Sequence, residues 1–369
     1  MDADVIVAGG GVIGTAVAWR AAAAGRDVIL VDPGDDGEKA SLVAAGMLAP
    51  VSESVFGEED LLALNLLALE RFPGFTRELE DAAGQEAGLR TEGTLNVACD
   101  SGDLAALVRL AEFRRGIGLP AEVVSGRECR RFEPFLASNV AGGLLAAGDL
   151  SVDNRRYFRA LRAAAARAGV RAVAGTVAAI DGGAVTLATG DVITATSVVA
   201  AVGWATSRVN GIPDPVRKAV RPVKGQILRL RHPGALPPVA TRTIRALVAG
   251  RDVYLVPRAD GEIVVGATQE ERGDTDITAG AVHDILSDAM TALPAVSELI
   301  LAETSAGLRP GSTDNGPIVG PAADRLIIAA GHFRNGILLS AATADAVTAL
   351  LDGKDPAPQW APFTPGRFS

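Results

Sequence analysis

The chain of 369 residues is long enough for two or three domains around a large hydrophobic core. Its net charge of −9, without any run of lysine or arginine, argues against a surface for nucleic acid or anionic membranes. The longest uncharged run, 192–207, is too short to cross a membrane, and the acidic start leads into an apolar strand instead of a signal peptide. Two cysteines, Cys99 and Cys129, are too few for a disulfide framework, so we expect both to be reduced and partly buried. These features predict a cytoplasmic protein with no nucleic-acid or membrane partner.

The first motif is a glycine turn between an apolar strand and a helix. Gly9, Gly11 and Gly14 occupy the three fixed positions of the dinucleotide fingerprint G-x-G-x-x-G. Gly9 permits the tight turn, Gly11 lets a pyrophosphate approach the backbone, and Gly14 lets the helix pack close to the strand. The helix N-terminus, which includes Val12 and Ile13, offers unpaired N–H groups and a partial positive charge to phosphate.

A second predicted strand, 27–31, ends on Asp32, where an acidic side chain is placed to bond a ribose hydroxyl. Strand, turn, helix and terminal acid together predict nucleotide binding but leave NAD and FAD both open. The small, apolar segment 41–50 has two interpretations. Either its backbone approaches something bulky, or it is the start of a buried helix.

Helical and strand patterns alternate through the first half of the chain. Leucines at helical spacing over 61–69 predict a core-facing helix that Pro73 ends or kinks. A strand at 94–99 precedes an amphipathic helix over 104–116. We expect its arginines on a solvated face: Arg109, Arg114 and Arg115.

The second half returns to strands. A helix over 157–168 is followed by three strands separated by glycine-rich turns, which resembles a return to the nucleotide domain: 170–177, 184–189 and 197–202. Strands at 253–258 and 262–267 flank Asp260-Gly261, a strong hairpin signal, and predict an antiparallel sheet in a second domain. A helix over 279–293 follows.

The last third contains a second strand, glycine turn and helix, at 326–330, 331–336 and 337–351. A nucleotide-type motif so late in the chain indicates that the nucleotide domain is discontinuous. We expect the proline-rich tail after Asp355 to be a loosely packed surface strap.

Six blocks in this order resemble the D-amino acid oxidase family of flavoproteins and, within it, the glycine oxidases of thiamine biosynthesis. They are VAGGGVIG at 7–14, AGML at 45–48, PVKGQ at 222–226, YLVPR at 254–258 with VGAT at 265–268, GLRP at 307–310 and GHFRNGILL at 331–339. They span nearly the whole chain, and the last is the most specific. The resemblance implies an α/β fold with a discontinuous, Rossmann-like FAD-binding domain and an α+β substrate domain on an antiparallel sheet. The segments we predict are 1–88, 150–221 and 309–369 for the first domain, and 89–149 and 222–308 for the second.

The resemblance also implies that the dinucleotide is FAD, bound non-covalently. Sarcosine-type relatives attach the flavin through a late cysteine, whereas no cysteine lies beyond position 129 here. Main-chain N–H groups of the 331–339 turn and helix would stabilise negative charge on the pyrimidine edge of the flavin. Segment 45–48 would approach the ring near N5, and the backbone of Val177 would meet the adenine. The remaining cofactor contacts implied by the family are Ala45, Gly46, Met47, Gly203, Trp204, His332, Arg334, Asn335, Gly336, Ile337 and Leu338.

On the substrate side, Arg309 matches the family's carboxylate-binding arginine, and Tyr254 matches the tyrosine that helps it. A guanidinium offers a planar, two-pronged contact to a carboxylate, and a phenol adds one donor. Arg334 resembles a second cationic residue near the pocket mouth. Met47 is predicted to belong both to the catalytic residues and to the cofactor contacts.

The implied reaction is hydride transfer from the Cα of a neutral amine to flavin N5, with O2 reduced to hydrogen peroxide. No side chain has to take the α-proton, so the lack of an obvious catalytic histidine or carboxylate pair is no objection. The implied role is oxidation of glycine or another small amine, and dehydroglycine, the imine formed from glycine, would supply the thiazole of thiamine. A thiazole synthase partner and a homo-oligomer are implied with it.

Three alternatives stay open: a D-amino acid or sarcosine-type oxidase, a dehydrogenase with another electron acceptor, and a non-catalytic flavin-binding module. Asp252 and Gln269 stand where related glycine oxidases carry a histidine and a methionine, so pocket polarity differs here. The 201–204 stretch is also one residue tighter than the family's usual spacing.

Overall fold

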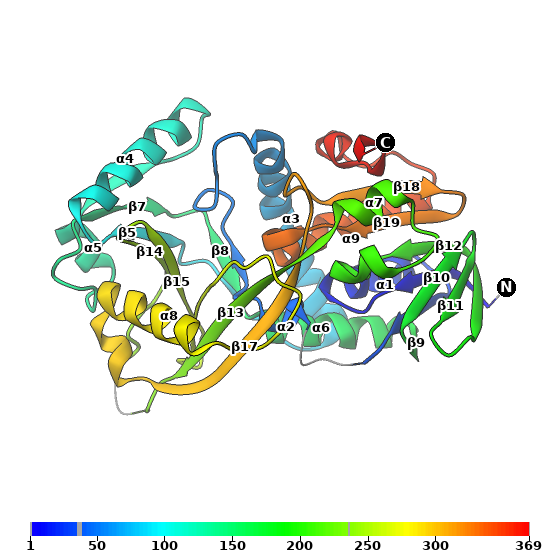
Figure 1. The fold of residues 1–369 in the computed structure, drawn as a ribbon, viewed down its shortest axis with the longest axis horizontal. Coiled ribbons are helices and arrows are strands. Elements are labelled where there is room, and N and C mark those ends of the chain that lie inside the picture. The colour runs from blue at the N-terminus through cyan, green and yellow to red at the C-terminus, as the bar shows by residue number, and fades with distance from the viewer. Residues whose placement is uncertain (1, 35–38, 235–236, 369) are drawn as a thin grey trace.

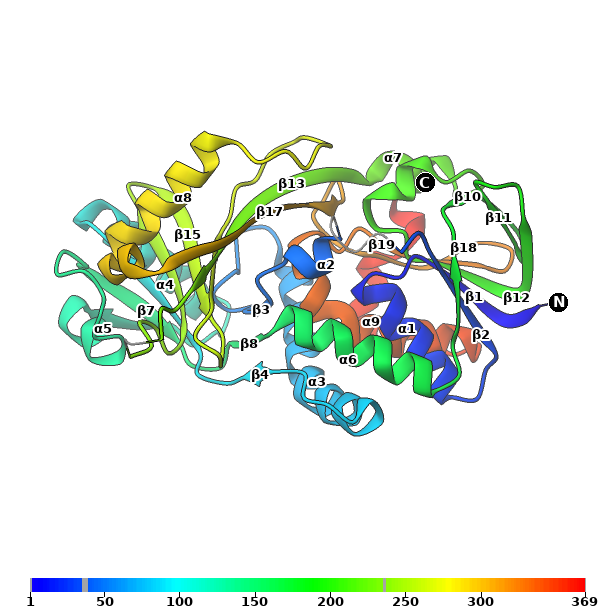
Figure 2. The same cartoon turned by 90° about the horizontal axis from the view of Figure 1, so that it is seen from below.

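Two eight-stranded sheets lie at opposite ends of the molecule (Figures 1 and 2). A third sheet has three strands. This computed structural model describes residues 2–34, 39–234 and 237–368. The α/β fold class expected from the sequence is confirmed. None of the helices in the described ranges combines the length and apolar character that a membrane span needs.

The first sheet has a parallel core. Its parallel strands are β1 (Ala3–Ala8), β2 (Val28–Asp32), β9 (Arg171–Ala174), β12 (Val192–Ala200) and β19 (Leu326–Ala330). Antiparallel strands extend it: β10 (Val177–Asp181), β11 (Ala184–Leu187) and β18 (Ile318–Ala323). Parallel pairing requires crossovers, which here are helices and long excursions into the rest of the molecule.

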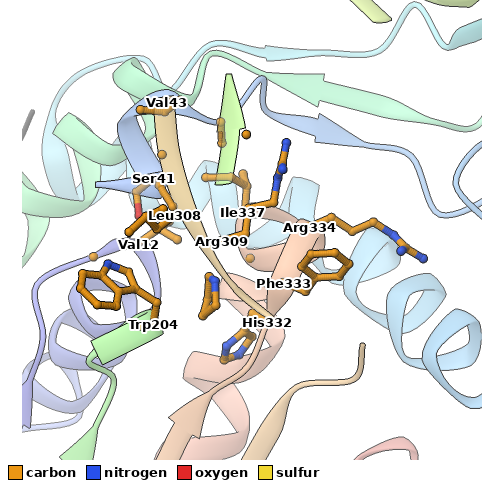
Figure 3. Close-up of a pocket in the computed structure, with 18 of the residues that line it drawn as sticks. Val12, Ser41, Val43, Trp204, Leu308, Arg309, His332, Phe333, Arg334 and Ile337 are labelled. Carbon is orange, nitrogen blue, oxygen red and sulfur yellow. Dashed lines mark hydrogen bonds between the residues drawn. The ribbon is translucent and has the colours of Figure 1, made fainter. Parts of the chain in front are cut away.

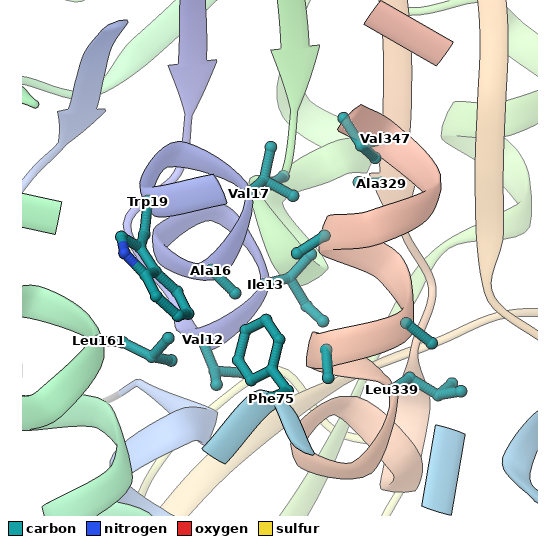
Figure 4. Packing of buried hydrophobic residues seen from close by; sticks show 14 of the residues in the cluster. Val12, Ile13, Ala16, Val17, Trp19, Phe75, Leu161, Ala329, Leu339 and Val347 are labelled. Atoms are coloured by element: carbon teal, nitrogen blue, oxygen red, sulfur yellow. The ribbon is translucent and has the colours of Figure 1, made fainter. Parts of the chain in front are cut away.

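Four helices pack together beside this sheet (Figure 2). They are α1 (Val12–Ala23), α3 (Glu59–Ala83), α6 (Asn154–Arg167) and α9 (Gly336–Leu351). Figure 4 shows Ile13 and Ala16 of α1 facing α9, with Phe75 of α3 close by. Trp19 and Phe75 meet edge to face with ring centroids 5.1 Å apart. Both strand–turn–helix units expected at the ends of the chain therefore share one core.

Helix α3 does not end at Pro73, so that alternative is wrong, and a kink at the proline stays a prediction. The helix continues to Ala83, with Pro73 inside it. Phe72, Phe75 and Leu79 are fully buried around the proline. Burying three large side chains stabilises the helix by several kcal/mol, which offsets the roughly 3 kcal/mol cost of an interior proline.

The second sheet is almost entirely antiparallel, as the hairpin signal predicted. Its strands, in spatial order, are β17 (Ile300–Gly311), β13 (Arg221–Arg231), β16 (Ile263–Gly266), β15 (Arg251–Pro257), β14 (Thr243–Val248), β5 (Thr94–Ala98), β7 (Gly142–Ala146) and β6 (Glu122–Ser125). Helices α8 (Ala279–Ala292), α5 (Gly126–Phe132) and α4 (Ser101–Gly116) accompany it. The long strands β13 and β17 run side by side toward the first sheet (Figure 2).

Side chains alternate across this sheet with the period of two expected of strands. Leu228 and Leu255 pack with Ile285 of α8 on one face. Their neighbours Ile227 and Tyr254 point to the opposite face, into a separate small cluster. Helix α8 packs on the first face, so the second face can form the wall of a cavity.

The remaining elements connect these parts. They are α2 (Ala40–Val43), α7 (Asp214–Ala219), the three-stranded sheet of β3 (Met47–Leu48), β8 (Leu150–Val152) and β4 (Leu89–Arg90), and the 3-10 turns at Gly203–Arg208, Pro294–Glu298, Phe333–Asn335, Pro358–Phe363 and Pro365–Phe368. The predicted domain boundaries remain a proposal. Strand β17 continues to Gly311, beyond the boundary proposed at 308/309.

Two surface expectations are wrong. Arg114 was expected on a solvated face, but its side chain is 1% exposed because its guanidinium is covered by the loop around Ser52. The C-terminal tail is not loosely packed, since Trp360 and Phe363 belong to the buried core of the first domain. The cysteines are free and buried, and burial raises the pKa of both thiols to about 11.

Candidate active site and cofactor site

A cavity of about 920 Å³ is lined by residues of both large sheets (Figure 3). This volume is at the upper end of the usual range for small-molecule and cofactor sites. The Gly9–Val12 turn lines the end predicted to hold the nucleotide, called the nucleotide end below, and Tyr254 and Arg309 line the end predicted to hold the substrate, called the substrate end.

The glycine turn is shaped by backbone contacts that leave no room for side chains. Gly9 has a φ of +102°, and a Cβ there would lie 2.3 Å from the Ala201 carbonyl oxygen. A Cβ on Gly14 would lie 1.8 Å from the Gly9 carbonyl oxygen. By contrast, a Cβ on Gly11 would meet only the Ser41 hydroxyl, at 3.4 Å, on a residue that lines the cavity. The turn is therefore a cradle that a bulky phosphate group fits.

Asp32 lies at the edge of this cradle and already has partners. Its carboxylate accepts the Gly10 N–H at 2.7 Å, the Gly34 N–H at 2.9 Å and the Lys39 ammonium at 2.6 Å. Its contact with a ribose stays a prediction. No sequence pattern singles out Ser41, whose hydroxyl accepts the Val12 N–H at 2.9 Å. This bond ties the 41–47 segment to the start of α1.

The C-terminal turn closes the cavity from another side. His332 is 2% exposed, and burial lowers its pKa to about 3, so its imidazole is neutral at pH 7. Its Nε2 lies 3.0 Å from the Thr343 hydroxyl. Helix α9 begins at Gly336, and no side chain caps its N-terminus. Its first N–H groups and the positive end of its dipole therefore suit an anionic group.

Most predicted cofactor residues come together in the cavity lining. Those that line it are Gly9, Gly11, Val12, Ile13, Asp32, Ala45, Gly46, Met47, Val177, Gly203, Trp204, His332, Arg334, Gly336 and Ile337. Three predicted residues, Gly14, Asn335 and Leu338, lie behind the lining. Leu338 belongs to the hydrophobic core, and Asn335 is buried at the start of α9.

At the substrate end, the guanidinium of Arg309 lies directly over Gly225. A Cβ on Gly225 would come within 2.3 Å of both terminal nitrogens of Arg309. Arg309 donates to the carbonyl oxygens of Thr268 and Lys224, at 3.1 and 3.4 Å. It forms no ion pair with any residue that the structure describes. Burial raises the pKa of the Tyr254 phenol, against the opposing charge of Arg309, so the phenol remains a donor at neutral pH.

Two other guanidiniums at this end are neutralised by glutamates that the sequence did not single out. Arg245 pairs with Glu53 at 2.9 Å. Arg334 pairs with Glu58, and Figure 3 shows its side chain pointing away from Trp204 at the nucleotide end. Of these three arginines, Arg309 alone has only neutral partners among the described residues. Arg334 thus lines the cavity, but its charge is already matched.

Asp252 and Gln269 both line the cavity and are exposed. The loop from Ser52 to Phe56 also lines it, and no local pattern predicted that contribution. Because these residues meet only through tertiary packing, spacing along the chain could not have identified them.

Comparison with known proteins shows which family the chain belongs to. Residues 4–350 match the DAO family, described as FAD dependent oxidoreductase. A glycine oxidase of Geobacillus kaustophilus is 32% identical over 98% of this chain and 96% of its own length. The bifunctional protein ThiO/ThiG of Synechocystis sp. is 34% identical over 99% of this chain, which spans 54% of that protein. The crystal structure of the Geobacillus kaustophilus glycine oxidase matches with a TM-score of 0.89 over 98% of both chains.

The glycine cradle, the uncapped start of α9 and the size of the cavity all fit FAD. The fold and the family match agree with that fit along almost the entire chain. The chain belongs to the DAO family of FAD-dependent oxidoreductases, and its cofactor is FAD.

Proposed function

We propose that the chain is an FAD-dependent oxidase of glycine or another small amino acid or amine. The observation that carries this proposal is Arg309, a cation without an acidic partner among the described residues, in the same cavity as the nucleotide turn. Arg309 is partly buried, and a partly desolvated cation with only neutral partners is costly unless it binds an anion. The substrate carboxylate supplies that anion, and the glycine oxidases among the relatives support the choice.

The residues of the chain bind and orient the substrate. Arg309 makes a two-pronged contact with the carboxylate, and the protonated Tyr254 phenol donates one further hydrogen bond. The carbonyls of Thr268 and Lys224 hold the guanidinium from behind, so its orientation is set before the substrate arrives. Orientation of this kind lowers the barrier because the bound amine needs no further alignment.

FAD, when bound, supplies the hydride acceptor and passes the electrons to O2, which becomes hydrogen peroxide. Neutral His332 adds no positive charge to the site, and the N-terminus of α9 favours negative charge at the cofactor edge it faces. The imine product of glycine is dehydroglycine. The ThiO/ThiG names of several relatives support its use in thiazole synthesis with a thiazole synthase partner. The cytoplasmic location and the homo-oligomer stay predictions.

Anaerobic titration tests this proposal. We expect glycine to bleach the yellow flavin absorbance of purified enzyme, and air to restore it with release of peroxide. Sarcosine and D-alanine, titrated in parallel, rank the small-amine alternatives by their bleaching rates. Colour that persists with all three substrates contradicts the oxidase proposal. Rapid dye reduction with little peroxide would instead indicate a dehydrogenase.

A further inference from the structure

The wall of the substrate compartment contains an arginine that the proposed reaction does not use. Arg245 of β14 is paired directly with Tyr254 of β15 on one side and with Asn96 of β5 on the other. Directly paired residues on neighbouring strands point to the same face of a sheet. All three line the cavity, so Arg245 is the neighbour of the substrate-binding tyrosine.

Tyr254 lies in the fields of two guanidiniums. Burial raises the pKa of its phenol, while the charges of Arg309 and Arg245 both lower it and that of Glu53 raises it. A substrate whose carboxylate contacts Arg309 and Tyr254 therefore has Arg245 on the same wall, next to the tyrosine.

Glu53 neutralises Arg245 from a loop that is fixed in place. The ion pair is 2.9 Å long, and its side chains are 19% and 16% exposed. The fully buried Asp149 accepts the N–H groups of Val51 and Ser52 at 3.2 and 3.1 Å. Arg114 donates to the Ser52 carbonyl at 2.8 Å from the other side. Glu53 is thus held by the fold, whereas a surface glutamate would be free to turn away.

The balance of charge on this wall is negative. Asp252 lies on the same face as Arg245 and has no hydrogen bond or ion pair with the residues that the structure describes. Arg245 contributes one positive charge, and Glu53 and Asp252 contribute two negative charges. A substrate with a second carboxylate would meet net repulsion at this wall, because like charges in a partly desolvated site are costly.

We propose that Glu53 sets the substrate class by occupying Arg245, which restricts the enzyme to amines with a single carboxylate. Arg245 is, on this proposal, a second carboxylate site that becomes usable when the charge of Glu53 is removed. The inference rests on the proposed function, in which Arg309 takes the first carboxylate.

Two related substrates and two variants test this inference in the holoenzyme. Sarcosine and iminodiacetate both carry one substituent on the glycine nitrogen, a methyl and a carboxymethyl group respectively, so their comparison isolates the second carboxylate. Glu53→Gln keeps an oxygen that accepts from Arg245 and removes the charge. We expect the ratio of kcat/KM for iminodiacetate to that for sarcosine to rise about tenfold or more. Adding Arg245→Gln should abolish the rise.

Asp288→Asn is the matched control. Asp288 pairs with Arg251 at 2.5 Å on the α8 side of the same sheet, outside the cavity lining. The control removes one carboxylate from an ion pair and should leave the substrate ratio unchanged. A change of less than about twofold in Glu53→Gln would overturn the inference, as would a gain that persists when Arg245 is also replaced.

A binding measurement separates this inference from the proposed function. Acetate and malonate are titrated into the oxidised enzyme, and their dissociation constants are read from the flavin absorbance without turnover. We expect Glu53→Gln to improve malonate binding about tenfold relative to acetate. Failure of wild type to oxidise glycine contradicts the proposed function alone, whereas an unchanged malonate preference contradicts the role of Glu53.

Discussion

The two ends of the cavity are built from different materials. The nucleotide end consists of backbone and glycine, with carbonyl oxygens of Gly9 and Ala201 filling the places of side chains. The substrate end includes charged side chains from strands, loops and turns, and Glu53–Arg245 and Glu58–Arg334 join residues 192 and 276 positions apart. The glycine turn cannot accept added side-chain atoms where backbone lies so close. At the substrate end, changing one charge should instead change which substrate binds. Substitutions at the two ends should therefore fail in different ways.

The largest effect is expected at the nucleotide end, for Gly14→Ala. Its Cβ would fall 1.8 Å from the Gly9 carbonyl oxygen, and Gly9 is itself fixed against Ala201. Because both neighbours are backbone, we expect a loss of about 3 kcal/mol or more in the free energy of unfolding, with loss of FAD. Thermal unfolding measures the loss of stability, and the ratio of flavin to protein absorbance measures the loss of FAD.

Gly280→Ala is the control for this substitution. Gly280 lies in α8, where an added Cβ meets nothing within 4 Å. Removing a helical glycine should stabilise the protein by about 0.5–1 kcal/mol. A Gly14→Ala enzyme with full flavin content and unchanged stability would refute the close approach of α1 to the strand.

Arg309→Met should affect turnover at the substrate end without affecting FAD binding at the nucleotide end. We expect full FAD content but a fall in kcat/KM for glycine of about two to four decades, because the variant leaves a buried carboxylate without its cation. Arg251→Met, on the solvated end of β15, should keep wild-type kcat/KM. Loss of FAD together with turnover in Arg309→Met would mean that Arg309 supports the cofactor end instead.

The same contrast explains what could be predicted from the sequence. The roles of Gly9 and Gly14 can be predicted because the fingerprint has fixed spacing. The hairpin at Asp260-Gly261 can be predicted because turn formation depends on local residues. Arg309 and Tyr254 were identified through family resemblance, since no local pattern distinguishes them from surface or core residues. The pairing of Arg334 with Glu58 depends on how distant segments pack, and local sequence does not contain it.

Burial was also misjudged where tertiary contacts decide it. Arg114 follows a helical pattern that places it among solvated arginines, yet the Ser52 loop covers it and provides its hydrogen-bond acceptors. Pro73 stops isolated helices, yet the core around Phe72 and Phe75 holds α3 together through it. In both cases the deciding contacts come from segments far away in sequence: the Ser52 loop for Arg114, and residues such as Trp19, which packs on Phe75, for α3.

A smaller effect is expected for Gly225→Ala at the substrate end. Its Cβ would contact the far end of the Arg309 side chain, which can move, so the fold should tolerate the change. Displacing the guanidinium should raise KM for glycine and lower kcat/KM about tenfold, at unchanged FAD content. Gly273→Ala, whose Cβ makes an ordinary 3.5 Å contact with Pro222, should behave as wild type. An unaffected KM in Gly225→Ala would argue that Arg309 does not bind the substrate from the observed position.

The last effect concerns the pH dependence of stability at the cofactor end. Burial lowers the folded-state pKa of His332 from 6.5 to about 3. Between these values the unfolded chain binds a proton that the folded chain does not, so stability falls as pH drops below 6.5. From pH 7.5 to pH 5, His332→Gln should lose about 2 kcal/mol less unfolding free energy than wild type, measured by urea denaturation. His283→Gln, at an exposed position, should follow wild type. Parallel pH profiles for wild type and His332→Gln would show that the imidazole reaches solvent, and that the cofactor end is less tightly closed than its backbone contacts require.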